Sequence, residues 1–185
     1  MNRLLSVIAA LTVCAVAAEA QNASIGTNVM DYADFGTLNA EASLGVARHW
    51  SVNAAVRYNP FSYSGGSGDM GMQNRQQMYS AGVRYWPWHI FSGWWLAAKA
   101  QYQEYNRGGI SSPETSEGDR FGSGLSAGYS YMLAPHFNIE IGAGVWGGYD
   151  KFVKYSCPTC GRVIDQGDKY FFLLNEVLLS LAYVF

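Results

Sequence analysis

The residues best suited to chemistry in this 185-residue sequence are the two cysteines of a C-x-x-C-G segment, Cys157 and Cys160. In an exported protein, such a pair is expected to form a disulfide that closes a tight turn. A zinc site would need two further ligands, from a second chain or from nearby acids. A redox pair would need a helix N-terminus and a lowered thiol pKa, and the sequence indicates neither. We expect the disulfide, with metal and redox chemistry as alternatives.

The sequence offers few residues for general acid–base catalysis. The histidines His49, His89 and His136 all fall in segments that we expect to form short turns at one end of the fold. Barrel enzymes that cleave peptides or transfer lipid acyl chains hold a histidine, with a serine or an acid, at the opposite end. A general base is therefore missing from the place where substrate would arrive. We expect no enzymatic activity and no cofactor.

The elements that must position these residues are strands, of which the last is the most clearly marked. Counting back by twos from the C-terminus gives a row that is entirely apolar or aromatic: Val177, Leu179, Leu181, Tyr183 and Phe185. A period of two predicts a strand with different surroundings on its two faces. A last strand that ends on an aromatic residue resembles the assembly signal of bacterial outer-membrane barrels. The alternative is the closing strand of a soluble sandwich.

Eight segments show strand character, and no convincing amphipathic helix lies between them. They are residues 24–30, 38–47, 50–58, 75–86, 94–105, 120–133, 137–149 and 169–185. Short turns follow the second, fourth and sixth segments, whereas long polar stretches, residues 59–74, 106–119 and 150–168, follow the third, fifth and seventh. Short turns at one end and long loops at the other predict an outer-membrane barrel with extracellular loops and periplasmic termini.

Most of these segments alternate between an apolar row and a row of polar or small residues. The polar rows carry three acids and three bases: Glu41, Glu140, Glu176, Arg57, Arg84 and Lys99. A barrel of eight strands is too narrow for a water channel, and buried charges must be paired. We therefore predict a plug of ion pairs, with glycines on neighbouring strands making room for the long side chains. A selective pore or a proton path is the alternative.

Aromatic residues decide which row faces outward. One group falls at the short-turn end: Trp50, Trp86, Trp88, Phe91, Trp94, Trp95, Phe137 and Phe185. A second group falls near the long loops: Tyr58, Phe61, Tyr63, Tyr102, Tyr105, Phe121, Tyr149, Phe152 and Phe171. Two girdles separated by aliphatic residues are typical of a barrel that meets two lipid–water interfaces. The apolar rows are therefore predicted to face lipid.

Composition and the N-terminus agree with export to a membrane. Charged residues make up 14% of the sequence, against roughly 25% in an average soluble domain. Residues 1–20 are predicted to be a cleaved signal peptide, with Arg3 in its n-region and an A-x-A site ending at Ala20. Residues 21–185 then form the barrel. The formal net charge of -2 gives no reason to expect a nucleic-acid partner.

Several short motifs are specific in their order and spacing: Gly26-Thr27-Asn28, Arg48-His49-Trp50, Tyr58-Asn59-Pro60, Val83-Arg84-Tyr85-Trp86, Gly108-Gly109, Gly128-Tyr129 with Tyr131, Tyr149-Asp150-Lys151 and Cys157-Pro158-Thr159-Cys160-Gly161. On these motifs, the chain resembles a family of Bacteroidetes outer-membrane barrel proteins of unknown function. The resemblance implies an eight-stranded barrel. It also implies a cell-surface context, because members are thought to lie often among surface-fimbria genes. It implies no catalytic residues.

Together these observations predict an eight-stranded antiparallel outer-membrane β-barrel with a filled interior. Its expected role is to present surface loops for binding or for a structural role in the envelope, with fimbrial or other cell-surface proteins as partners. Outer-membrane lipid and the barrel-assembly machinery are its other expected partners. The main alternative is a small transport or gated pore, and the third is a lipid-modifying barrel enzyme.

Overall fold

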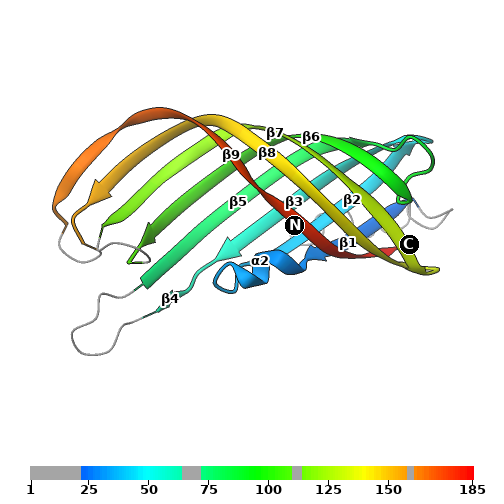
Figure 1. The fold of residues 1–185 in the computed structure, drawn as a ribbon, viewed down its shortest axis with the longest axis horizontal. Helices are drawn as coiled ribbons and strands as arrows, with labels where there is room; N and C mark the ends of the chain where they lie inside the picture. The colour runs from blue at the N-terminus through cyan, green and yellow to red at the C-terminus, as the bar shows by residue number, and fades with distance from the viewer. Residues whose placement is uncertain (1–21, 64–71, 110–113, 158–160) are drawn as a thin grey trace, which may run out of the picture.

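The computed structural model describes residues 22–63, 72–109, 114–157 and 161–185, which exclude the predicted signal peptide. Eight strands close into one antiparallel barrel, as predicted, and a strand of two residues continues the pairing beyond the third of them (Figure 1). The elements are β1 (Ala23–Asn28), α2 (Val29–Ala33), β2 (Leu38–Ala47), β3 (Trp50–Asn59), β4 (Ser62–Tyr63), β5 (Met72–Tyr85), β6 (Gly93–Gly108), β7 (Thr115–Ala134), β8 (Phe137–Tyr155) and β9 (Val163–Val184).

The strands are staggered as a closed barrel requires. Cross-strand partners traced from Ile25 of β1 through β2, β3, β5, β6, β7 and β8 return to β9 at Phe172. Ile25 itself, however, pairs with Tyr183 of the same strand. This offset tilts the strands against the barrel axis, which lets a sheet of eight strands close on itself.

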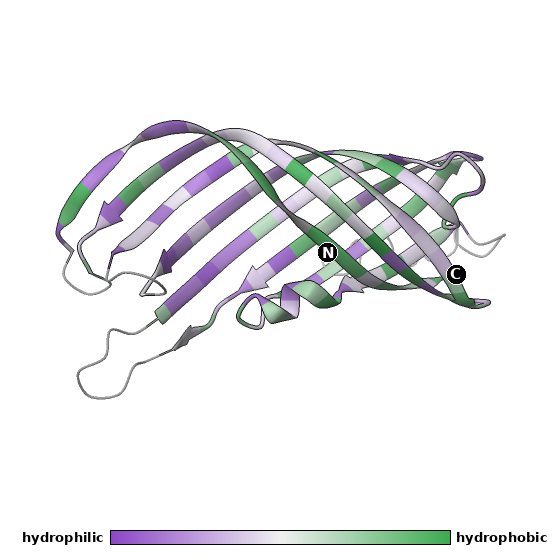
Figure 2. Ribbon diagram, in the orientation of Figure 1, coloured by the Kyte–Doolittle hydropathy of each residue, from purple (hydrophilic) through white to green (hydrophobic). Residues whose placement is uncertain are grey.

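The predicted alternation of faces is present in the structure. Leu125 and Ile141 point outward and are 64% and 61% exposed, whereas the inward Ser126 and Glu140 are buried. Successive side chains of a strand point to opposite faces, so each strand gives one row to the interior and one to the outer surface. Along the strands, the residues are mostly hydrophilic near β4 and become more hydrophobic towards the opposite end of the barrel (Figure 2).

The barrel has two different ends. One end carries the short connections that follow β2, β5 and β7, together with the start of β1 and the end of β9. We call it the turn end, and it lies on the right of Figure 1. We call the opposite end the loop end. There the wall is uneven: β1 has 6 residues and β2 has 10, whereas β7, β8 and β9 have 20, 19 and 22. The extended parts of these strands are largely hydrophilic (Figure 2).

The prediction of three long loops was wrong in extent. Strand β5 already begins at Met72, β6 continues to Gly108 while β7 begins at Thr115, and β8 and β9 are separated only by residues 156–162. Beyond the apolar band both faces of the strands become polar, so the hydrophobic period of two disappears although cross-strand pairing continues. More than half of residues 106–119 and 150–168, which were predicted as loops, therefore belong to paired strands of a polar wall.

A short helix replaces the end of the first predicted strand. Asn28 ends β1 and caps α2, because its side-chain oxygen accepts a hydrogen bond from the Met30 amide at 3.2 Å. The sequence pattern does not indicate this helix, because a helix of 5 residues is too short to show a hydrophobic period. Within the described ranges, no helix combines the length and hydrophobicity needed to cross a membrane.

A hydrophobic core fills the turn end of the barrel. It consists of Trp86, Phe91, Trp95, Ala97, Leu178 and Val184, with Ile90 packed against it. The prediction that Trp86, Phe91 and Trp95 belong to an outer aromatic girdle is wrong. These side chains are 0%, 3% and 1% exposed, because they belong to the inward rows or to the turn that folds back into the barrel. A cluster of aromatic residues in the sequence therefore does not show whether their side chains fill the barrel interior or surround its outer surface.

Candidate functional site

The interior above the aromatic core holds a buried ion-pair network centred on Arg84. Its guanidinium contacts Glu140 of β8 at 3.0 Å and Glu41 of β2 at 2.5 Å. The same group lies 4.5 Å from the centre of the Trp95 ring. Three of the six predicted interior charges thus meet at one point, and they join strands on opposite sides of the barrel.

The other predicted interior charges are placed differently. Arg57 pairs with Asp31 of α2 at 2.7 Å, an acid that lies between the first two predicted strands. Lys99 lines a small interior cavity beside Arg84. Glu176 lies on β9 opposite Gly144, and its side chain is outside the described part of the structure. Asp31 follows the N-cap residue Asn28 by three positions, and an acid in this position is a sequence signal for the start of a helix.

Little space is left around this network. Two cavities beside Arg84 measure about 30 and 20 Å³, which is room for one or two water molecules each. Below them lies the aromatic core, in which Trp95 fits closely against the wall. A Cβ atom added at Gly128 would lie only 2.5 Å from the Trp95 ring, so glycine at this position makes room for the indole. The described interior is filled by side chains.

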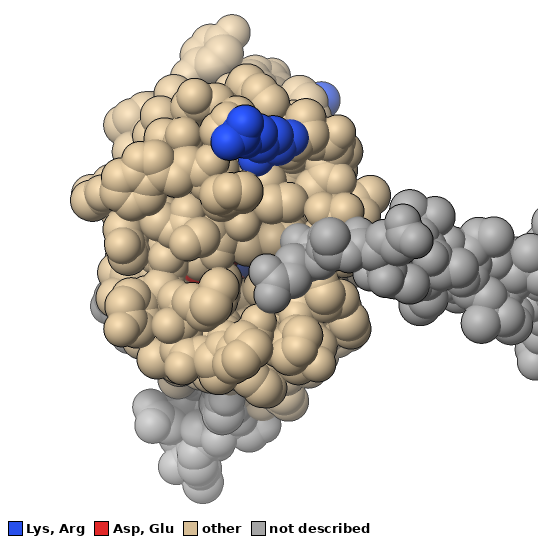
Figure 3. Space-filling model, turned by 90° about the vertical axis from the view of Figure 1, so that its right-hand side faces the viewer, with Lys and Arg blue, Asp and Glu red and all other residues tan. Residues whose placement is uncertain are grey.

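The turn between β5 and β6 closes the turn end from inside. Phe91 has a positive φ of 61°, an uncommon conformation for a residue with a side chain. Its carbonyl accepts hydrogen bonds from Asn138 at 2.6 Å and Ser130 at 3.2 Å, both buried. These bonds hold the turn against the barrel wall. Seen from the turn end, the surface is mostly uncharged, with a few basic side chains at the rim and little acidic surface (Figure 3).

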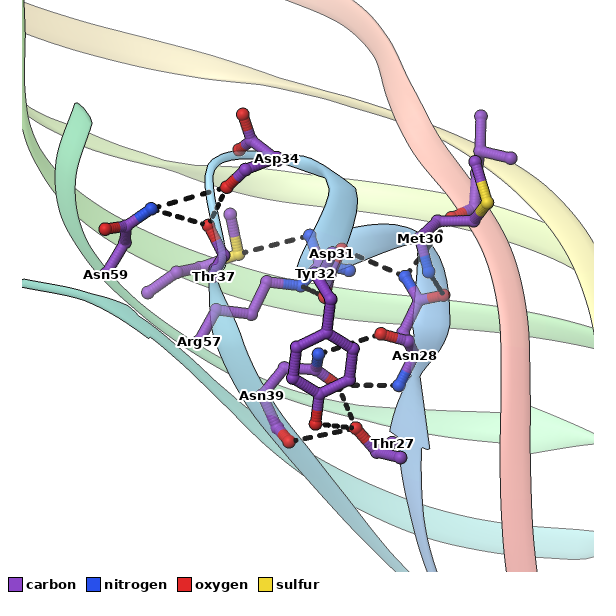
Figure 4. A network of polar contacts seen from close by, with 12 residues as sticks. Thr27, Asn28, Met30, Asp31, Tyr32, Asp34, Thr37, Asn39, Arg57 and Asn59 are labelled. Carbon is purple, nitrogen blue, oxygen red and sulfur yellow. Dashed lines mark hydrogen bonds and ion pairs between the residues drawn. The ribbon is translucent and has the colours of Figure 1, made fainter. Parts of the chain in front are cut away.

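Helix α2 fills the gap where β1 stops and β9 continues (Figure 4). The Asn28 side chain replaces a strand partner, donating to the Val177 carbonyl at 3.2 Å and accepting from the Leu179 amide at 3.0 Å. The helix is held from the other side by the pair between Arg57 and Asp31. A further hydrogen bond from Asn28 to Asp31, at 2.9 Å, connects the two anchors.

Replacing Asn28 by alanine is expected to lower the free energy of unfolding by about 2–3 kcal/mol, because several partly buried groups then lose hydrogen-bond partners. A urea titration of the protein in detergent micelles measures the change. Asn106→Ala is a suitable control, since Asn106 donates a hydrogen bond to Glu117 on the outer face. If both variants unfold at the same urea concentration, the Asn28 side chain does not secure the junction between β1 and β9.

A second buried charge cluster stiffens the polar wall at the loop end. Asp150 of β8 has a fully buried side chain that contacts Arg120 at 3.1 Å and Lys169 at 3.7 Å, and Tyr105 donates to it at 3.0 Å. This cluster was not predicted from the sequence, because Asp150 falls in a segment that was predicted as a loop. The continued period of two, which sets Arg120 on the same face as Gly122, could have revealed it.

A large open groove, of about 810 Å³, lies at the loop end. It crosses the sheet from β3 to β9 along a row of cross-strand neighbours: Tyr58, Gln77, Glu104, Asp119, Lys151 and Asp168. These residues belong to the outward rows of their strands. At the edge of the groove, a hydrogen bond of 2.6 Å to Glu117 raises the pKa of Tyr155 above its usual value. Tyr155 therefore stays neutral and keeps donating.

The predicted cysteine and histidine chemistry is placed as follows. Cys157 is disulfide-bonded. Cys160 lies outside the described residues, so its pairing with Cys157 stays a prediction that a thiol count with and without reductant checks. His49 and His136 lie at the turn end, where their Nδ1 atoms contact the Trp86 carbonyl at 2.9 Å and the Val184 carbonyl at 2.8 Å. Among the described residues, no group of three His, Cys, Asp or Glu side chains is placed to hold a metal ion.

Two comparisons with known proteins give a family but no activity. A family model described as "Protein of unknown function (DUF3575)" matches residues 6–185. No curated protein matches the chain.

Proposed function

Because the chain belongs to the DUF3575 family, whose description assigns no activity, we propose from its geometry that it is a membrane-anchored binding module. In this proposal the barrel spans the bacterial outer membrane, and its loop-end wall binds a surface partner. The observation that carries it is the contrast between the two kinds of space. The interior holds cavities of about 30 and 20 Å³, whereas the outer groove measures about 810 Å³.

The membrane position rests on the outer surface. Outward side chains along the barrel, such as Leu96, Leu125 and Ile141, are each more than half exposed and form a band around it. Apolar surface of this extent is unusual for a soluble monomer and is typical of a surface that contacts lipid. The polar wall beyond the band would then project from the membrane, and the turn end, with the start of β1 and the end of β9, would face the periplasm.

The two alternative functions have less support from this arrangement. A transport or gated pore would need a path past Trp95, Arg84 and Glu140, all of which are buried. A lipid-modifying enzyme would need a general base near the outer leaflet, but the described histidines lie at the turn end. We therefore propose that the chain acts through its loop-end surface, with another cell-surface component as its partner.

Labelling of single cysteines with a membrane-impermeant maleimide tests the orientation. In a background where Cys157 and Cys160 are replaced by serine, Asp168→Cys at the loop end is expected to react in intact cells. Arg48→Cys at the turn end is expected to react only after the outer membrane is permeabilised. Leu125→Cys is expected to stay unlabelled in both. Labelling of Arg48→Cys in intact cells, or of all three positions equally, would contradict the proposed membrane position.

A further inference from the structure

We propose that the loop-end groove is a site for a neutral or amino-sugar oligosaccharide, an inference that rests on the proposed binding function. The groove has the size of a ligand site, since about 810 Å³ lies within the usual range of about 300–1,000 Å³. It is open and elongated, because its lining residues come from six neighbouring strands. An extended ligand that lies across the strands fits this shape better than a compact one does.

The side chains that line the groove suit a ligand rich in hydroxyl groups. Amides from Gln77 and Asn106 both donate and accept hydrogen bonds, and carboxylates such as Asp168 only accept. A sugar hydroxyl also donates and accepts, so neighbouring hydroxyls of one ring can be satisfied by an amide next to a carboxylate. At one end of the groove, the Tyr58 side chain is 48% exposed and offers an aromatic face to the apolar face of a sugar ring.

The charge of the groove selects among oligosaccharides. Four carboxylates line it, from Glu104, Glu117, Asp119 and Asp168, against the two cations Arg75 and Lys151. An excess of acids disfavours sulfated or phosphorylated ligands and tolerates amino groups. The groove is therefore predicted to prefer neutral or amino sugars.

One pair of these acids is placed against the ordinary rules of sheet stability. Glu104 and Asp119 are directly opposite on the outward faces of β6 and β7, where like charges destabilise a sheet. Tyr102 contacts both, donating to Glu104 at 2.9 Å and lying 3.3 Å from Asp119. On its other side, Asp119 lies opposite Lys151 of β8, an attractive cross-strand pair that offsets part of this repulsion. The two acids therefore place hydrogen-bond acceptors next to one another in the middle of the groove.

The position of the groove matches the depth of a sugar layer. From β5 to β9, the row of cross-strand neighbours one step closer to the turn end is aromatic, whereas its β3 member is Val56. The aromatic members are Tyr79, Tyr102, Phe121, Tyr149 and Tyr170. Aromatic residues mark the interface between hydrocarbon and head groups. The groove would then lie immediately outside the membrane, where sugars occur both as the head groups of glycolipids and as free or cell-attached glycans.

Binding to an array of defined neutral, amino and sulfated oligosaccharides tests the site, with the full-length protein purified in detergent. At least one neutral or amino oligosaccharide is expected to bind, and the sulfated ones are not. The double variant Gln77→Ala/Asp119→Asn is expected to lose affinity at least tenfold. Asp165→Asn is the matched control, because Asp165 is an exposed acid of β9 outside the groove lining. Its affinity should be unchanged.

Vesicles distinguish the two sources of sugar. Retention of the protein on vesicles that contain glycolipid, but not on vesicles of glycerophospholipid alone, supports a head group as the ligand, and binding to the free oligosaccharides supports a glycan. Absence of binding to both, preference for the sulfated probes, or equal loss in the double variant and the control overturns the inference. Because the array uses purified protein, its failure leaves the surface orientation, tested by cysteine labelling, unaffected.

Discussion

Replacing Trp95 by alanine is expected to lower the free energy of unfolding by about 3–5 kcal/mol, the range observed when a buried tryptophan is truncated. Trp95 is 1% exposed and lies between the Trp86 ring and the Arg84 guanidinium, with ring centres 6.5 Å apart and the cation 4.5 Å from its own ring. Truncation leaves a cavity inside a rigid barrel wall that cannot collapse to fill it. Urea unfolding in detergent micelles measures the change.

The neighbouring Trp94 provides a matched control. It is 58% exposed on the outer face, so Trp94→Ala in micelles is expected to cost much less than Trp95→Ala. Trp95→Phe, which keeps most of the volume, should recover a large part of the lost stability. Equal unfolding midpoints for Trp94→Ala and Trp95→Ala would show that the aromatic core does not fill the barrel as described.

Replacing Arg84 by alanine is expected to have a comparable effect, about 3–5 kcal/mol, because two carboxylates then lose the cation they share. Arg84 and Glu140 have side-chain exposures of 6% and 7%, so water compensates little for the lost contact. Removing one partner of a buried pair costs more than the pair contributes, since a charge remains buried without its counter-ion. The unfolding midpoint of the variant in urea provides the measurement.

A triple variant separates this effect from a loss of packing. Arg84→Met combined with Glu41→Gln and Glu140→Gln removes the charges together and is expected to regain most of the stability that Arg84→Ala loses. If the triple variant is as unstable as Arg84→Ala, charge pairing is not what the network contributes.

The sequence predicted the barrel well because its signals are local and repeated. Alternation in rows such as Leu125 to Tyr131, together with short turns at one end, depends only on residues close in the chain, and it led to the correct number and arrangement of strands. The same signal failed at the loop end. Around Lys151 and Asp168 both faces of the strands are polar, so no hydrophobic pattern marks a strand there. The strands nevertheless stay extended because their backbones pair across β8 and β9.

The candidate site was less predictable, because it depends on contacts between distant segments. Glu41, Arg84 and Glu140 could be assigned to the interior by their rows, but the register that brings them together was not visible in the sequence. The inward position of Trp95 required knowing that Gly128 leaves space beside it. The groove required the alignment of Gln77, Glu104 and Asp119 across three strands, which only the closed barrel provides.

The central claim is that this barrel is filled and acts through its outer loop-end surface. Conductance of the full-length protein in a planar lipid bilayer tests it most directly. The structure predicts no steady current, since the cavities beside Arg84 hold about 30 and 20 Å³ and the aromatic core lies below them. A steady, ion-selective current through the unmodified protein would contradict the claim and favour a transport function.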